Sequence, residues 1–475
     1  METRDNHHAM KSRMKKLLVT VIFSICLAGF ARADLAKRID AIINQPSQKK
    51  VQFSIRIVKA DTGKTIYSHN ANKPLVPASN MKIIITAATL EFLGPDYEFK
   101  TQVGLHGDAL IVIGSGDPLL GDKITDAKYG RKIGWIFEDI TSALKKNSIK
   151  IIKDIIVDSS IFDDQRAHPN WPADQLNKWY ACEVCGLNYN GNCIDIRAKN
   201  TDGKVTLFIE PKTDYVKITN KVKPISKGTS VIGSYRKQEL NKIVVYGKCK
   251  KQIEPFAVAI ERPAAFFGFL LAQNLNKAGI NIKGQFIEKE LGSNYAIKEL
   301  AEYSTPLVDC LERCNKNSFG LAAEALLKTI AANTNPYKKN GSWTEGQKAV
   351  SHYLRSIGID KNEFFIDDGS GLSRDNKLSA NALTTALLYV YKSNNWSVFK
   401  NSLAVGGTDG TIAKYFKEEK YKGRILGKTG YIDGVKSFSG ICTTDKGDYI
   451  FSILTNNNFK SRKPINDIAK AIFEN

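Results

Sequence analysis

The sequence predicts an α+β fold, in which an antiparallel sheet is flanked by helices from both ends of the chain and a large strand-rich region is inserted. Three observations predict it. A short strand hairpin leads into an apolar helix near the amino end, and three strands separated by tight turns precede an amphipathic helix at the carboxyl end. A long region rich in strands and in Gly, Asp and Lys turns lies between them. Helices grouped around an antiparallel sheet make an α+β arrangement.

The amino end differs from the rest of the chain. Residues 10–16 are rich in lysine and arginine, residues 17–29 form an apolar run, and Ala31-Arg32-Ala33 has the small-x-small pattern of a signal-peptidase site. This order predicts a signal peptide over residues 1–33 and a secreted, periplasmic protein. Cys26 follows a poor lipobox, which disfavours lipidation. Because no interior stretch approaches roughly 18 continuous apolar residues, no transmembrane anchor is predicted.

The front of the mature chain reads as strand, turn, strand and buried helix. Residues 51–59 alternate as a strand, Asp61-Thr62-Gly63 forms a turn, and residues 64–68 return as a second strand. An apolar, helix-compatible stretch follows over residues 79–93, and Gly94-Pro95 ends it.

Residues 101–252 have the character of an inserted region. They lack long helical periodicity except at residues 133–146, and a smaller nested module is expected near residues 198–234. We therefore expect residues 34–100 and 253–475 to form one domain around this insertion.

The back of the chain supplies the remaining helices and strands. Apolar faces at helical spacing predict helices over residues 264–278, 306–333 and 344–357, and a final amphipathic helix over residues 464–473. Strands are predicted over residues 424–431, 435–444 and 448–455, joined by tight turns. The first hairpin of the chain is placed to complete the same sheet.

Composition restricts the partners. The 475-residue chain has a formal net charge of +21, so a secreted form is expected to seek anionic surfaces of the cell envelope. No dense basic tract with interleaved aromatic residues is present, which argues against nucleic acid. Seven cysteines follow the signal, and outside the cytoplasm they favour disulfides over a zinc site. The C-x3-C spacing of Cys310 and Cys314 is also unlike a zinc knuckle, so no metal or cofactor is expected.

Ser79 and Lys82 form the first candidate for chemistry. Residues three apart on a helix share a face, and a partly desolvated Lys amine can take the hydroxyl proton of a serine. Ser-x-x-Lys occurs six times in this chain, so the motif alone does not identify a nucleophile. The position of Ser79 at the head of an apolar helix, directly after a hairpin, distinguishes it from the others.

Lys428-Thr429-Gly430 is the second candidate. It occurs once and lies on a predicted strand, where a Lys amine and a Thr hydroxyl suit a substrate carboxylate and Gly430 allows close approach of a backbone. A phosphate-binding loop is excluded, because only three residues separate Gly423 from Gly427 and a strand follows instead of a helix. A Ser-His-Asp hydrolase is disfavoured too, since no Gly-x-Ser-x-Gly elbow is present.

Ser-x-x-Lys followed by Lys-Thr-Gly belongs to a set used by penicillin-binding proteins and class A β-lactamases, with a third motif between them. The best candidate for that middle motif is Ser318, at a loop-to-helix junction in the right order. With these motifs the chain resembles the class C low-molecular-mass penicillin-binding proteins, the D-alanyl-D-alanine carboxypeptidase/endopeptidase family. The further segments that carry the resemblance are Gly114-Ser115-Gly116-Asp117-Pro118, Asp158-Ser159-Ser160, Trp171-Pro172, Tyr180-Ala181, Ala323-Glu324, Asp368 to Arg374 and Asp409-Gly410-Thr411.

The resemblance implies a penicillin-binding/β-lactamase-like domain and a role for each motif. Ser79 would attack the D-Ala-D-Ala carbonyl of peptidoglycan stem peptides and would also be acylated by β-lactams. Lys82 would be its base, and Ser318 would relay a proton to the departing amine. Lys428 and Thr429 would hold the terminal carboxylate. Backbone N–H groups of Ser79 and Tyr431 would form the oxyanion hole.

One departure from the family pattern stands out. The middle motif of the family is Ser-x-Asn, whereas this chain has Ser318-Phe319-Gly320. Asn317 or Asn315 is a candidate substitute for the missing amide. The alternative is a divergent or impaired relative that binds wall peptide or a protein partner without efficient turnover. Asp174 and Gln175 compete for the position in the inserted region that would read the side chain of the stem peptide.

Overall fold

The computed structural model describes residues 34–292, 295–334 and 340–475. The predicted signal peptide, residues 1–33, therefore lies outside the described residues. Within the described ranges no helix has the length and apolar character needed to cross a membrane.

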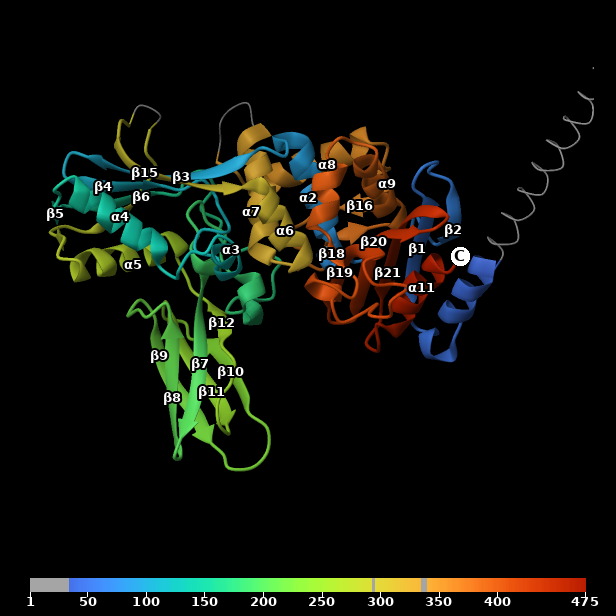
Figure 1. The fold of residues 1–475 in the computed structure, drawn as a ribbon, viewed down its shortest axis with the longest axis horizontal. Coiled ribbons are helices and arrows are strands. Elements are labelled where there is room, and N and C mark those ends of the chain that lie inside the picture. Colours follow the sequence, from blue (N-terminus) through green and yellow to red (C-terminus); the bar gives the residue numbers. More distant parts are fainter. Residues whose placement is uncertain (1–33, 293–294, 335–339) are drawn as a thin grey trace, which may run out of the picture.

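A six-stranded antiparallel sheet forms the centre of the larger body (Figure 1). The first hairpin joins the carboxyl-terminal strands, because β1 pairs with β21 along its whole length, from Gln52 opposite Asn456 to Lys59 opposite Tyr449. That prediction is confirmed. The order of the strands is β18 (Ala404–Val405), β19 (Ile425–Ile432), β20 (Val435–Thr444), β21 (Gly447–Asn456), β1 (Gln52–Lys59) and β2 (Thr65–His69).

Helices cover both faces of this sheet, which explains why β20 is buried over eight successive residues. One face packs against residues 34–43, which are helical, and α11 (Lys463–Phe473). The other face packs against a layer of helices whose buried side chains form one cluster. These helices are α2 (Met81–Leu93), α6 (Leu307–Lys316), α7 (Gly320–Thr334), α8 (Trp343–Ser356), α9 (Ala380–Tyr391) and α10 (Trp396–Ser402).

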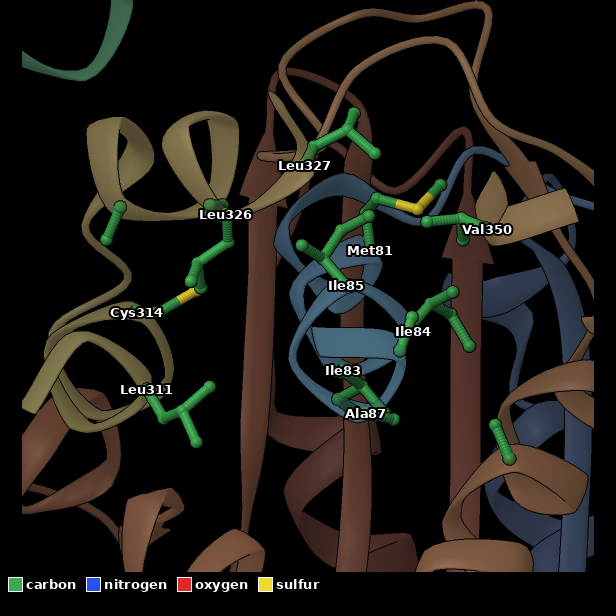
Figure 2. Packing of buried hydrophobic residues seen from close by; sticks show 14 of the residues in the cluster. Met81, Ile83, Ile84, Ile85, Ala87, Leu311, Cys314, Leu326, Leu327 and Val350 are labelled. Carbon is green, nitrogen blue, oxygen red and sulfur yellow. The ribbon is translucent and has the colours of Figure 1, made fainter. Parts of the chain in front are cut away.

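Helix α2 lies at the middle of that layer. Its residues from Met81 to Leu90 are all buried, so it is enclosed around its whole circumference rather than along one stripe. Figure 2 shows its side chains pointing towards Leu311 and Cys314 on one side and Val350 on another. A helix enclosed in this way gives its first turn a fixed position.

The structure corrects one prediction in this domain and adds elements that the sequence analysis did not predict. The single helix predicted over residues 306–333 is two helices, because Ser318 between α6 and α7 has a φ of 60° and interrupts the helical path. The helical segment at residues 34–43 and the helices α9 and α10 were not predicted. A short two-stranded ribbon of β16 (Phe364–Phe365) and β17 (Lys377–Leu378) also joins this domain.

A second body is built on a five-stranded mixed sheet, against which α4 (Trp135–Lys146) and α5 (Pro263–Lys277) pack. Its strands, in order, are β14 (Phe286–Glu288), β6 (Ile155–Asp158), β4 (Ala109–Ile113), β3 (Glu98–His106) and β15 (Lys298–Pro306). The pair β5 (Ile151–Ile152) and β13 (Asn281–Ile282) and the helix α3 (Lys123–Lys128) lie in the same region. The inserted region of residues 101–252 remains a prediction; α5, β14 and β15 of this body follow residue 252 in the chain.

Two three-stranded sheets project from this second body as a lobe at the bottom of Figure 1. The first, in order, is β12 (Phe256–Ala259), β7 (Cys193–Thr201) and β8 (Lys204–Glu210). The second is β10 (Val231–Arg236), β11 (Lys242–Cys249) and β9 (Lys217–Pro224). This lobe contains the residues for which a nested module was expected, near 198–234.

Candidate active site

Ser79 lies in a tight 3-10 turn, Ala78–Asn80, that leads directly into α2. The turn is fixed by the strands beneath it. Ser437 donates a hydrogen bond through Oγ to the carbonyl of Pro77 at 2.7 Å, and Asn80 Nδ2 donates to the carbonyl of Lys428 at 2.9 Å. Ala78 itself has a φ of 47°, a strained conformation for a residue with a side chain, which these contacts hold in place.

Two glycines allow the chain to close around this turn. A Cβ at Gly430 would lie 2.2 Å from Ser437 Oγ and 2.7 Å from the carbonyl oxygen of Pro77, and one at Gly371 would lie 1.9 Å from the carbonyl oxygen of Ala78. Gly371 also has a φ of 81°, which favours glycine. The close approach at Gly430 is therefore made by the Ser79 turn of the same chain, and Gly430 does not line the cleft.

Lys82 reaches Ser79 from the next turn of the helix. Its Nζ lies 3.1 Å from Ser79 Oγ and donates a second hydrogen bond to the carbonyl of Ser370 at 2.6 Å. The side chain is almost completely buried. Burial lowers the pKa of Lys82 below its usual value, and the nearby Cys314, Glu324 and Asp368 oppose this only in part. A lysine with a lowered pKa is suited to accept a proton from the serine.

The carbonyl that orients Lys82 belongs to a loop held by two buried carboxylates. Glu324 accepts hydrogen bonds from the backbone N–H groups of Ser370 at 2.7 Å and Gly369 at 2.9 Å. Asp368 accepts from the N–H groups of Gly371 and Ser373, each at 2.7 Å. Burial, followed by the charge of Asp368, raises the pKa of Glu324 to about 7. The loop is thus held by side chains that touch neither Ser79 nor Lys82.

Ser318 faces this pair from the break between α6 and α7. Its Oγ accepts a hydrogen bond from Lys428 Nζ at 2.9 Å. The break is anchored from behind, because Arg313 forms a two-point ion pair with Asp122, with Nε and Nη2 each 2.8 Å from the carboxylate oxygens. The guanidinium of Arg313 also lies 4.8 Å from the centroid of the Phe319 ring. An ion pair between the two bodies therefore supports the break at which Ser318 lies.

Lys428 is fully buried behind Ser318 and is not among the residues that line the cleft. Its burial lowers its pKa well below the usual value, and the positive charges of Lys82 and Arg462 act in the same direction. The exposed hydroxyls beside it come from Thr429 and Thr411, whose Oγ1 atoms are 2.9 Å apart. A carboxylate in the cleft would meet these hydroxyls first, with the ammonium of Lys428 behind them.

Ser79, Lys82, Ser318 and the two threonines line a cleft of about 570 Å³ between the two bodies. Tyr431 lies at the edge of this cleft and is 66% exposed. The cleft is lined by Ser79, Lys82, Pro172, Gln175, Trp179, Tyr180, Asn317, Ser318, Gly320, Ser370, Gly371, Leu372, Arg374, Thr411, Thr429, Tyr431, Ile432 and Asp433.

The structure separates the alternatives that the sequence left open. Asn315 is buried, and its Nδ2 donates to Thr86 Oγ1 at 3.1 Å and Ser402 Oγ at 2.9 Å, so it is not a substitute for the missing amide; Asn317 is exposed and lines the cleft. Gln175 lines the cleft, whereas Asp174 is exposed outside the lining.

The space beside Gly320 is already occupied. A Cβ at this position would lie 2.9 Å from the backbone oxygen of Tyr180, which belongs to the second body. The absence of a side chain at residue 320 therefore lets the Trp179–Ala181 turn approach α7.

No cysteine of the described residues lines the cleft. Among the described residues all seven are free and buried, namely Cys182, Cys185, Cys193, Cys249, Cys310, Cys314 and Cys442. No group of three or more His, Cys, Asp or Glu in the described ranges is arranged to hold a metal ion, and the predicted disulfides are not formed.

The family model of the D-Ala-D-Ala carboxypeptidase 3 (S13) family matches residues 35–474. The chain belongs to this family. A D-alanyl-D-alanine carboxypeptidase of an Actinomadura species is 26% identical over 464 residues, which cover 90% of this chain and 82% of that protein. The D-alanyl-D-alanine carboxypeptidase DacB of Haemophilus influenzae is 23% identical over 467 residues, covering 93% of this chain and 91% of the relative.

The solved structure of penicillin binding protein 4 from Haemophilus influenzae is similar to this S13 family chain, with a TM-score of 0.77 at 22% identity. The match covers 92% of this chain and 98% of that one. The same protein has been solved with a β-lactam bound. The resemblance and the α+β, penicillin-binding/β-lactamase-like fold predicted from the sequence are confirmed by these matches.

Several residues of this S13 chain had no role in the sequence analysis. Thr411 and Arg374 line the cleft, the Ser370 carbonyl orients Lys82, and Asp122 with Arg313 supports the break at Ser318. Thr411 and Arg374 stand in segments that carried the family resemblance, which was the available signal. The pairing of Asp122 with Arg313 spans 191 residues, and no local pattern indicates it.

Proposed function

We propose that this protein is a serine-type D-alanyl-D-alanine carboxypeptidase/endopeptidase that acts on peptidoglycan stem peptides through an acyl-enzyme on Ser79. The observation that carries the proposal is the contact between Lys82 Nζ and Ser79 Oγ at 3.1 Å, in a buried site that lowers the pKa of the lysine. Membership of the S13 family supports the substrate class.

Acylation begins with the neutral amine of Lys82. It takes the proton of Ser79 Oγ as that oxygen bonds to the carbonyl carbon of the penultimate D-Ala residue. The carbonyl oxygen becomes negative, and backbone N–H groups of Ser79 and Tyr431 donate to it. An oxyanion hole of this kind contributes about 10²–10³ in rate for each donor.

Collapse of the tetrahedral intermediate breaks the peptide bond. Ser318 Oγ, which accepts a hydrogen bond from Lys428 Nζ at 2.9 Å, passes its proton to the departing amine and regains one from the Lys82 ammonium, so that Lys82 is a neutral amine again. The products of this half-reaction are free D-alanine, or a second peptide in the endopeptidase reaction, and an ester on Ser79. Water then attacks the ester with Lys82 as base and restores the hydroxyl.

Recognition of the terminal carboxylate falls to the hydroxyls of Thr429 and Thr411, 2.9 Å apart at the cleft wall. Buried Lys428 acts from behind them. A carboxylate that arrives at these hydroxyls brings a negative charge close to Lys428, raises its pKa and favours its protonated form. This gives Lys428 a charge that depends on the presence of substrate.

The location and the domain plan belong to the same proposal. A secreted, periplasmic protein with residues 1–33 removed would meet stem peptides in the wall, and the inserted region of residues 101–252 supplies the wall of the cleft that contains Gln175 and Tyr180. The proposed steps use side chains and backbone groups of this chain together with one water molecule.

The experiment measures D-alanine release from a pentapeptide muropeptide and cleavage of a cross-linked muropeptide, with fluorescent penicillin labelling beside them. We expect wild-type protein to release D-alanine and take the label, and Ser79→Ala to do neither. Ser142→Ala, which changes another Ser-x-x-Lys motif, is the matched control and is expected to match wild type. Labelling without any peptide product would support the impaired-relative alternative, and no labelling at all would refute the proposal.

A further inference from the structure

The projecting lobe carries a surface whose residues have no role in the cleft. In residues 193–249 lysine and arginine outnumber aspartate and glutamate by twelve to five. The strand register divides these residues between two sides of the sheet β10-β11-β9, because successive side chains of a strand point to opposite faces. One side packs into the core of the second body through Ile218, Val222, Ile232, Ile243 and Val245.

The other side we call the β9–β11 face. Across its three strands Gly233, Tyr246 and Lys221 lie in one row, and Val231, Lys248 and Lys223 lie in the next. Tyr235 and Lys217 continue the face on β10 and β9. None of these residues lines the cleft that contains Ser79.

Four lysines of the face are free to meet an anion. Lys217, Lys221, Lys223 and Lys248 are exposed, and none has an ion-pair partner within the described part of the chain. Neighbours on one face of a strand are about 7 Å apart, so Lys221 and Lys223 present two ammonium groups at regular spacing. A neighbouring ladder position, Lys248, adds a third beside them.

Two exposed tyrosines form an aromatic pair at the centre of the face, with their rings tilted by 49° to one another. Tyr235 and Tyr246 are 45% and 47% exposed, and their ring centroids are 5.7 Å apart. A Cβ at Gly233 would lie 2.8 Å from Tyr246 Oη and 2.9 Å from Tyr246 Cζ, so the Tyr246 ring lies across Gly233 along the sheet. One ring face therefore stays open to solvent, where the C–H face of a sugar ring can stack.

We propose that the β9–β11 face binds an acidic polysaccharide chain of the cell envelope, whose sugar rings stack on Tyr235 and Tyr246 while its carboxylates or phosphates meet the lysines. Charge complementarity identifies the sign of the partner, and the exposed aromatic pair favours sugar rings. A lipid bilayer fits less well, because the Tyr246 ring lies along the sheet and does not project into an acyl layer. The face would hold the enzyme on its polymeric substrate layer while the cleft acts on peptides.

The test measures binding of the full mature chain to polygalacturonate by co-sedimentation at low and high salt. We expect Lys221→Ala/Lys223→Ala/Lys248→Ala to weaken binding at least about tenfold. The matched control is Lys199→Ala/Lys204→Ala/Lys212→Ala, which removes the same charge from elsewhere on the lobe and is expected to weaken binding less than about threefold. Release of D-alanine from a small peptide is expected to be equal in all three proteins.

Further arms distinguish the partners. Tyr235→Ala/Tyr246→Ala keeps the charge and is expected to weaken polygalacturonate binding about fivefold or more, with circular dichroism to check folding. Equal loss in the two lysine triples would reduce the effect to net charge and overturn the proposal. Tyrosine variants that bind like wild type would also overturn it. Tighter binding to phosphatidylglycerol vesicles or to single-stranded poly-dT, with the same dependence on residues, would assign the face to a membrane or to nucleic acid instead.

Discussion

Substituting Gly320 tests how the chain accommodates its departure from the family motif. A Cβ at residue 320 would lie 2.9 Å from the backbone oxygen of Tyr180, closer than real Cβ contacts occur, and a backbone atom cannot move aside by a side-chain rotation. Overpacking of this kind costs about 1–3 kcal/mol. Replacing glycine in a helix returns up to about 1 kcal/mol, and less at the first residue. Gly320→Ala should therefore lower the free energy of unfolding by about 1–2 kcal/mol.

The same reasoning predicts that Gly320→Asn, which restores the family residue, fails to improve catalysis. Its Cβ meets the same oxygen, and relief requires the Trp179–Ala181 turn to move, although Trp179 and Tyr180 line the cleft. We expect kcat/KM for D-alanine release to fall several-fold.

The assay combines urea unfolding with peptide kinetics. Gly292→Ala is the matched control, because a Cβ there would meet no atom of the described residues within 4 Å, and its stability should stay within about 0.5 kcal/mol of wild type. A Gly320→Asn protein as stable as wild type, or one with a higher kcat/KM, would refute the reasoning.

Three more predictions follow from buried charges. Because burial lowers the pKa of Lys82, the rate of acylation by penicillin should rise with pH and level off below pH 10.5, and Lys82→Ala should reduce it about 10²–10⁴-fold; a rise that continues past 10.5 would contradict this. The pKa of Glu324 is raised from 4.5 to about 7, so the folded state keeps a proton that the unfolded state releases. As the pH rises from 4.5 to 7, the free energy of unfolding of the wild-type protein should thus fall by about 3 kcal/mol relative to that of Glu324→Gln. Urea titrations at several pH values measure this difference. If the free energies of the two proteins changed with pH in parallel, the assignment would be wrong. Arg313→Ala leaves the carboxylate of Asp122 buried without its partner and should destabilise the fold by about 3–5 kcal/mol, whereas a loss below about 1 kcal/mol in thermal unfolding would contradict the ion pair.

Elements with a strong local pattern were predictable from the sequence. The strands at residues 51–59 and 435–444 and the helix at residues 464–473 have clear periodicity, and the structure has them within one or two residues. The break between α6 and α7 was not predictable, because the apolar pattern continues through it while the left-handed φ of Ser318 is imposed by contacts with distant residues. The helical segment at residues 34–43, which directly follows the predicted signal peptide, was not predicted either.

The candidate site divides in the same way. Ser79, Lys82, Ser318 and Lys428 stand in short motifs, and the structure brings their side chains into two contacting pairs. The sequence did not indicate how deeply each residue of the site is buried. It did not indicate that Lys428 lies behind the cleft wall, or that the close approach at Gly430 is made by the chain itself. Such facts depend on pairings across hundreds of residues, which local patterns do not encode.

Acylation of Ser79 is the central claim, and mass spectrometry of the penicillin-treated protein tests it most directly. The wild-type chain is treated with benzylpenicillin, digested and searched for a penicilloyl group. The account predicts one adduct, on the peptide that contains Ser79, and none in Ser79→Ala. An adduct on another serine, or a Ser79→Ala protein modified to the same extent as wild type, would contradict it.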